Sequence, residues 1–96
     1  MIRDDVLKEA ANLISGDRAQ TYGDATASFA RVGIIWGALL DREPLTATEV
    51  ALCMTALKMV RLTGTADHRD SWVDAAGYIA LGAEAAATPS STGGTV

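Results

Sequence analysis

The sequence contains little of the chemistry that identifies many enzymes and secreted domains. Among its 96 residues there are one cysteine and one histidine, and aromatic residues make up 5% of the chain. The lone Cys53 cannot form an internal disulfide, which agrees with a reducing compartment, and His68 has no second His or Cys at zinc-binding spacing. A Ser-His-Asp order, a P-loop and a dinucleotide-binding glycine fingerprint are also missing. These absences exclude the common sequence signatures of those sites.

Positive charge is also scarce. The formal net charge is −4, so the chain lacks the basic footprint that duplex nucleic acid requires. The first residues are acidic where a signal peptide would be basic, and no apolar run is long enough to cross a bilayer. We therefore expect a cytoplasmic protein with neither duplex nucleic acid nor a membrane as its partner.

The apolar content is high, at 49%, and much of it is alanine, which favours closely packed helices. Apolar residues at helical spacing predict four helices, at about 5–15, 24–40 and 47–63 and from Asp67 or Ser71 to about 87. Thr46 and Glu49 form a capping-box pattern at the start of the third helix. The fold class is therefore all-α, a four-helix bundle-like domain over residues 1–87 with a flexible tail at 88–96. Because so small a domain buries little surface, we also expect a homo-oligomer.

Two glycines, Gly33 and Gly37, stand in the middle of the second predicted helix. Each costs roughly 1 kcal/mol relative to alanine in a helix interior. The pattern predicts that another helix crosses this face closely.

The most informative segment is the run from Val50 to Leu62, which is apolar on nearly every side except for Lys58 and Arg61. A helix of this kind is normally buried, and buried cations need partners. If the third and fourth helices form an antiparallel hairpin, a nearly constant index sum pairs Lys58 with Asp74 and Arg61 with Asp70. The sequence thus predicts a buried charged seam inside a core hairpin.

This seam has two interpretations, which the sequence leaves open. The four charged residues can make only structural ion pairs. Alternatively, Arg61 and Lys58 can receive phosphate or carboxylate oxygens at the edge of a cleft.

Asp70 and Asp74 stand four residues apart and can share a divalent cation, with Glu84 as a third acid further along the helix. Neutralising the cations is a competing role for both aspartates. Capping the fourth helix, with Ser71 or Asp67 as the other member of the box, is another.

A third group lies in the polar connector before the second helix. Arg18 can contact an anion, and Tyr22 can place its ring over a nucleobase or sugar. Tyr78 is a second tyrosine that can serve the base. The alternative for Tyr22 is that it only packs at the entrance of the helix.

Three segments carry a resemblance to a known family: ArgAlaGlnThrTyrGly at 18–23, LysMetValArg at 58–61 and AspSerTrpValAspAlaAlaGlyTyr at 70–78. With these motifs the chain resembles an uncharacterised family of short all-helical domains from bacteriophages and prophages, over roughly residues 18–84. Its helical layout is also distantly similar to the MazG-like nucleoside triphosphate pyrophosphohydrolases, which are dimers or tetramers and hold magnesium with acids on two helices. The resemblance implies a phage-type protein of the host cytoplasm.

Three functions follow as expectations. The first is a binding module for a nucleotide-like phosphorylated small molecule, using Arg18, Lys58 and Arg61 with Tyr22 or Tyr78. The second is a MazG-like hydrolase in which Asp70, Asp74 and Glu84 hold Mg²⁺, and no cofactor is implied otherwise. The third is a structural or interaction protein without a small-molecule site, so the sequence leaves open whether the protein is an enzyme.

Overall fold

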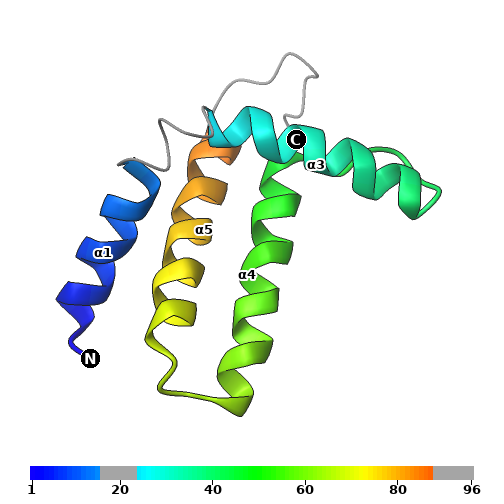
Figure 1. Cartoon of the computed structure of the whole chain (residues 1–96). Coiled ribbons are helices and arrows are strands. Elements are labelled where there is room, and N and C mark those ends of the chain that lie inside the picture. Colours follow the sequence, from blue (N-terminus) through cyan, green and yellow to red (C-terminus); the bar gives the residue numbers. More distant parts are fainter. Residues whose placement is uncertain (16–23, 88–96) are drawn as a thin grey trace.

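The computed structural model describes residues 1–15 and 24–87, and its regular elements there are four α-helices without a strand. They are α1 (Arg3–Ser15), α3 (Ala25–Leu39), α4 (Ala47–Gly64) and α5 (Arg69–Ala87) (Figure 1). The all-α prediction is confirmed, and the predicted helix limits agree within about two residues. The connector at 16–23, with Arg18 and Tyr22, and the predicted tail at 88–96 lie outside the described residues.

Helices α4 and α5 form the predicted antiparallel hairpin and pack against each other more extensively than any other pair of described helices (Figure 1). Gly82 of α5 faces Ala51 of α4 so closely that a Cβ on the glycine would lie 3.1 Å from the alanine Cβ. Val50 and Leu62 of α4 and Val73 of α5 are buried. Helix α1 packs along α5, where Gly77 faces Ile14. A MazG-like arrangement is not demonstrated by this layout.

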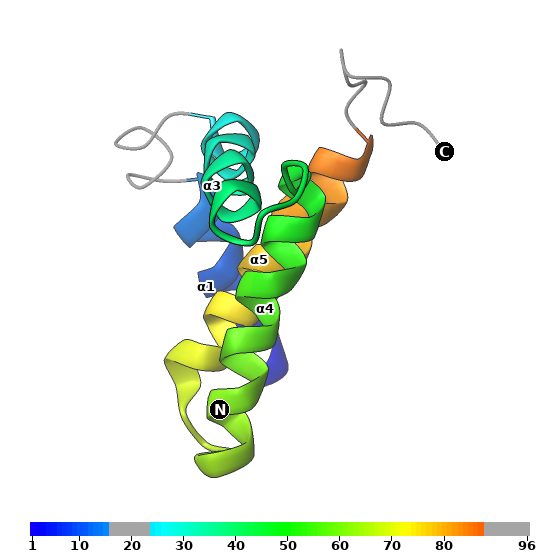
Figure 2. The ribbon, with the colours of Figure 1, turned by 90° about the vertical axis from the view of Figure 1, so that its right-hand side faces the viewer.

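Helix α3 crosses the end of the hairpin at which α4 begins (Figures 1 and 2). Its two glycines are buried against the segment that leads into α4: a Cβ on Gly37 would lie 2.8 Å from both Glu43 O and Pro44 Cα, and one on Gly33 would overlap the carbonyl oxygen of Leu45. The Leu45 amide donates to Gly33 O at 3.1 Å. The predicted close approach is therefore real, but its partner is this extended segment instead of a helix.

The start of α4 matches its sequence signal. Thr46 Oγ1 accepts from the Glu49 amide at 3.1 Å, and the Glu49 carboxylate accepts from the Thr46 amide at 2.8 Å. Both halves of the predicted capping box are thus formed.

The prediction that α4 is buried on all sides is wrong. Helix α5 covers one side and α3 covers the N-terminal end, while no described helix lies over the outer side (Figure 2). Leu52, Leu57, Met59 and Val60 are consequently 53% to 70% exposed. None of the described helices is long and apolar enough to span a bilayer.

Candidate functional site

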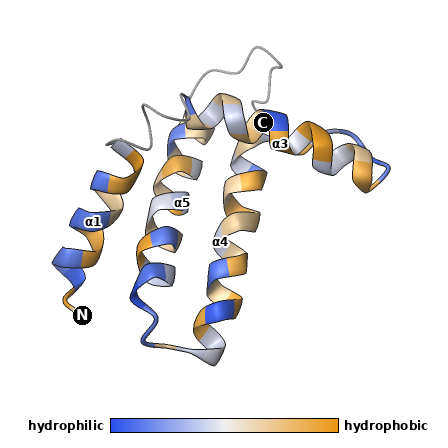
Figure 3. Ribbon diagram, viewed as in Figure 1, coloured by the Kyte–Doolittle hydropathy of each residue, from blue (hydrophilic) through white to orange (hydrophobic). Residues whose placement is uncertain are grey.

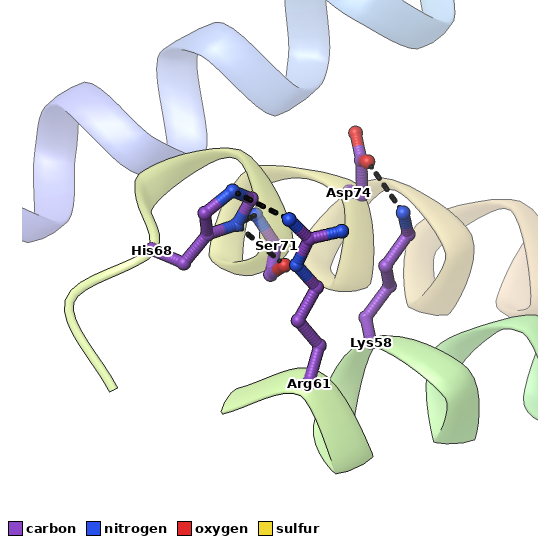
Figure 4. A network of polar contacts seen from close by, with 5 residues as sticks. All are labelled: Lys58, Arg61, His68, Ser71 and Asp74. Atoms are coloured by element: carbon purple, nitrogen blue, oxygen red, sulfur yellow. Dashed lines mark hydrogen bonds and ion pairs between the residues drawn. The ribbon is translucent and has the colours of Figure 1, made fainter. Parts of the chain in front are cut away.

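The charged seam begins with an ion pair between the two helices of the hairpin. Lys58 Nζ of α4 lies 3.1 Å from Asp74 Oδ2 of α5, as the index sum predicts (Figure 4). Both side chains remain about one quarter exposed. The seam is therefore half-buried at the surface of the hairpin, and the prediction of a buried seam is corrected.

The second predicted pair, Arg61 with Asp70, is wrong. Arg61 forms none of the ion pairs found among residues 1–15 and 24–87, and Asp70 is exposed. Instead, Arg61 Nη2 lies 3.4 Å from His68 Nε2. The reason is the geometry of the first turns of α5. Relative to Asp74, Ser71 is turned about 60° to one side and is buried, whereas Asp70 is turned about 40° to the other side and is exposed.

His68 immediately precedes α5 and folds back over its first turn (Figure 4). The Ser71 amide donates to His68 Nδ1 at 3.2 Å, so the imidazole caps the helix, and Ser71 Oγ lies 2.7 Å from the same nitrogen. From the sequence, His68 was considered only as a zinc ligand, and this capping role was missed. The signal available in the sequence was its position: His68 stands just before the helix, three residues before the amide that a capping side chain normally binds.

The cluster of Arg61, His68 and Ser71 has more N–H donors than acceptors. An arginine side chain only donates, and an imidazole offers one acceptor nitrogen when neutral and none when charged. If His68 Nδ1 accepts from the Ser71 amide, Nε2 carries a hydrogen that faces the Arg61 guanidinium. If Nε2 accepts from Arg61, Nδ1–H turns to Ser71 Oγ and the Ser71 amide keeps the His68 carbonyl oxygen, 3.1 Å away, as its acceptor. In both arrangements the remaining N–H groups of the exposed Arg61 guanidinium are left for another acceptor.

Helix polarity adds to this surplus. The cluster surrounds the first turn of the 19-residue helix α5, where the helix dipole is positive. Arg61 is exposed and faces this turn from α4. A small anion placed between Arg61 and His68 would accept from both side chains, and that geometry is typical of phosphate and carboxylate recognition.

The predicted metal ligands are not brought together. Glu84 is ten residues beyond Asp74 on α5, which is about 15 Å along the helix axis, and Asp74 is engaged by Lys58. In the described part of the chain, no group of three or more His, Cys, Asp and Glu side chains is placed to hold a metal ion. The structure thus gives no support for a magnesium site built from Asp70, Asp74 and Glu84.

Tyr78 lies one turn beyond Asp74 on α5. Its half-buried ring packs against Phe29 of α3, with ring centroids 6.2 Å apart and planes tilted by 49°. The structure thus places Tyr78 on the same helix face as Asp74 but not in contact with Arg61. The other candidates, Arg18 and Tyr22, lie outside the described residues.

Comparison with known proteins finds one matching family model and two relatives from phages. The family model described as a domain of unknown function, DUF6378, matches residues 5–86. The Gene 55 protein of Mycobacterium phage L5 is 40% identical over 73 residues, which are 76% of this chain and 47% of the relative. The Gene 55 protein of Mycobacterium phage D29 is 37% identical over 73 residues, 76% of this chain and 48% of the relative. The chain thus spans about half the length of these relatives.

No solved structure matches the chain. The phage relatives confirm the resemblance to an uncharacterised phage family, whereas the distant similarity to MazG-like enzymes gains no support. Because the family model covers most of the sequence, the chain belongs to the DUF6378 family.

Proposed function

We propose that the chain is a binding module for a phosphorylated, nucleotide-like small molecule. Its phosphate would sit at the turn end of the α4–α5 hairpin, between Arg61 and His68. The observation that carries the proposal is the exposed Arg61 guanidinium, which lies beside His68 at the first turn of α5 and has more N–H donors than this cluster has acceptors.

Arg61 is the main anion contact in this proposal. Its guanidinium is exposed and can bind two phosphate oxygens at once. Lys58 is one turn away on α4, but its charge is largely offset by Asp74 at 3.1 Å. Lys58 therefore contributes mainly by holding α5 in register with α4.

The nucleotide-like character of the ligand rests on Tyr78. Its half-buried ring is one turn beyond Asp74 on α5 and packs against Phe29, and the proposal places the base of the ligand against the part of this ring that remains exposed. A nucleoside monophosphate is therefore expected to bind more tightly than inorganic phosphate.

A thermal-shift titration tests the proposal. A ligand that binds only the folded state raises the free energy of unfolding by about 1.4 kcal/mol at ten times its dissociation constant, which corresponds to several degrees for a domain of this size. We expect inorganic phosphate to raise the melting temperature at millimolar concentrations and nucleoside monophosphates to do so at lower ones.

The matched variants are Arg61→Gln and Arg42→Gln. Arg42 is an exposed arginine in the segment between α3 and α4, at the opposite end of the hairpin from the cluster, so its variant removes the same charge without touching the cluster. Arg61→Gln should lose the shift and Arg42→Gln should keep it. The proposal fails if phosphate and nucleotides leave the wild-type melting temperature unchanged, or if both variants respond as the wild type does.

A further inference from the structure

The outer side of α4 is apolar and uncovered. Leu52, Leu57, Met59 and Val60 are 53% to 70% exposed around the part of α4 that α5 does not cover. Cys53 and Ala56 lie between them and are also exposed. A helix that is apolar all round belongs in an interior, yet residues 1–15 and 24–87 supply no second layer on this side.

The second half of α3 extends this surface. It projects past α4 beyond the end of the hairpin (Figure 1), and Figure 3 shows that this projecting part is largely hydrophobic. Four large aliphatic side chains here are 58% to 77% exposed. Together with the four of α4 they form what we call the outer apolar face: Ile34, Ile35, Leu39, Leu40, Leu52, Leu57, Met59 and Val60.

The size of the outer apolar face is that of an interface. Eight large aliphatic side chains, each more than half exposed, present on the order of 700–800 Å² of apolar surface, close to the roughly 800 Å² that each partner contributes to a standard interface. By contrast, the described core contains few buried hydrophobic side chains. Apart from two alanines they are Leu45, Val50, Leu62 and Val73. Such a core is small for a chain of this length.

We propose that the outer apolar face is covered by the same face of a second copy of the chain. From Val50 to Val60 the exposed stripe of α4 carries no charged side chain, so a two-fold contact along this stripe brings no like charges together. Because the core of one chain is small, burying this area in a dimer would add to the stability of the fold, so that folding and dimerisation are coupled.

The Lys58 part of the seam is turned away from this interface, because Lys58 is about a third of a helical turn from Leu52 and nearly half a turn from Ala56 and contacts α5. Leu57, by contrast, stands one turn before Arg61 on the same side of α4, so the interface borders the phosphate site. Sedimentation tests the dimer and the thermal-shift titration tests the phosphate site, so either claim can fail without the other.

Sedimentation velocity of the purified chain tests the proposal, together with the melting temperature at several protein concentrations. We expect a particle of twice the chain mass at about 10 µM, and a melting temperature that rises with concentration, as for a dimer that unfolds to monomers. Val60→Glu places a charge inside the interface and should raise the dissociation constant about 100-fold or more. The control is Leu7→Glu, at an equally exposed leucine of α1 outside the face, and it should remain dimeric.

The concentration dependence of the wild type keeps the test valid if Val60→Glu fails to fold. A wild-type chain that sediments as a monomer at about 100 µM, with a melting temperature independent of concentration, overturns the proposal and leaves the face to a different partner. A Val60→Glu variant that is as dimeric as the wild type overturns this choice of interface.

Discussion

Replacing Gly33 by alanine is expected to destabilise the protein, although alanine is the better helix former. The added Cβ would overlap the backbone carbonyl of Leu45, which cannot swing away as a side-chain tip can. To remove this overlap, the segment before α4 must move. Such a movement displaces the buried Leu45 side chain and weakens the hydrogen bond from the Leu45 amide to Gly33 O.

The magnitude follows from three contributions. Forcing extra volume into a packed site costs about 1–3 kcal/mol, and weakening the Leu45 hydrogen bond costs about 1 kcal/mol. The alanine returns about 1 kcal/mol through helix propensity. The net loss is about 2 kcal/mol, or about 10 °C in melting temperature for a domain of this size.

Chemical denaturation followed by circular dichroism, at one fixed protein concentration, measures the difference. The matched control is Gly64→Ala at the last residue of α4, where an added Cβ would lie in open space. That variant should be as stable as the wild type or more stable by up to about 1 kcal/mol. The account of the α3 crossing is refuted if Gly33→Ala is stabilised as Gly64→Ala is.

Two further predictions concern the ends and the seam of the hairpin. The Thr46 amide donates to the Glu49 carboxylate and thereby lowers the pKa of Glu49, so the box stabilises the fold above the ordinary glutamate pKa and this contribution is lost as the pH falls through the lowered value. In acid denaturation the Glu49→Gln variant should lack this pH-dependent part of the free energy of unfolding, about 0.5–1 kcal/mol. A pH profile of stability that is the same as for the wild type would contradict this role of Glu49. For the seam, a double-mutant cycle with Lys58→Met and Asp74→Asn should give a coupling free energy of about 0.5–1 kcal/mol, because both side chains are one quarter exposed. Additive effects of the two substitutions on stability would show that the pair is not energetically coupled.

Much of the hairpin was predictable because its signals are local. The capping box at Thr46 and Glu49 sets the start of α4, and the antiparallel index sum gives the pair of Lys58 and Asp74. The same sum gave the wrong partner for Arg61. Residues on one face of a helix recur every three or four positions, so a constant index sum does not hold along the whole hairpin. Near the turn, Ser71 is the buried residue at this position of α5, and Asp70 is exposed.

Two features depended on tertiary structure that the sequence does not specify locally. The role of His68 arises from a side chain that folds back onto its own helix and meets Arg61 from α4. The all-round apolar character of α4 does indicate that the helix is covered. It does not indicate whether the cover comes from the same chain, and in the described residues the cover on the outer side is missing.

The most direct test of the phosphate site is an NMR titration that follows the ring nitrogens of His68, the Arg61 side-chain Nε and the Ser71 amide as phosphate is added. The account predicts that all three signals shift together and saturate, with the hydrogen of His68 on Nε2 facing the anion and Nδ1 accepting from the Ser71 amide. If these signals remain unchanged up to tens of millimolar phosphate or nucleoside monophosphate while the protein stays folded, the hairpin end is not an anion-binding site.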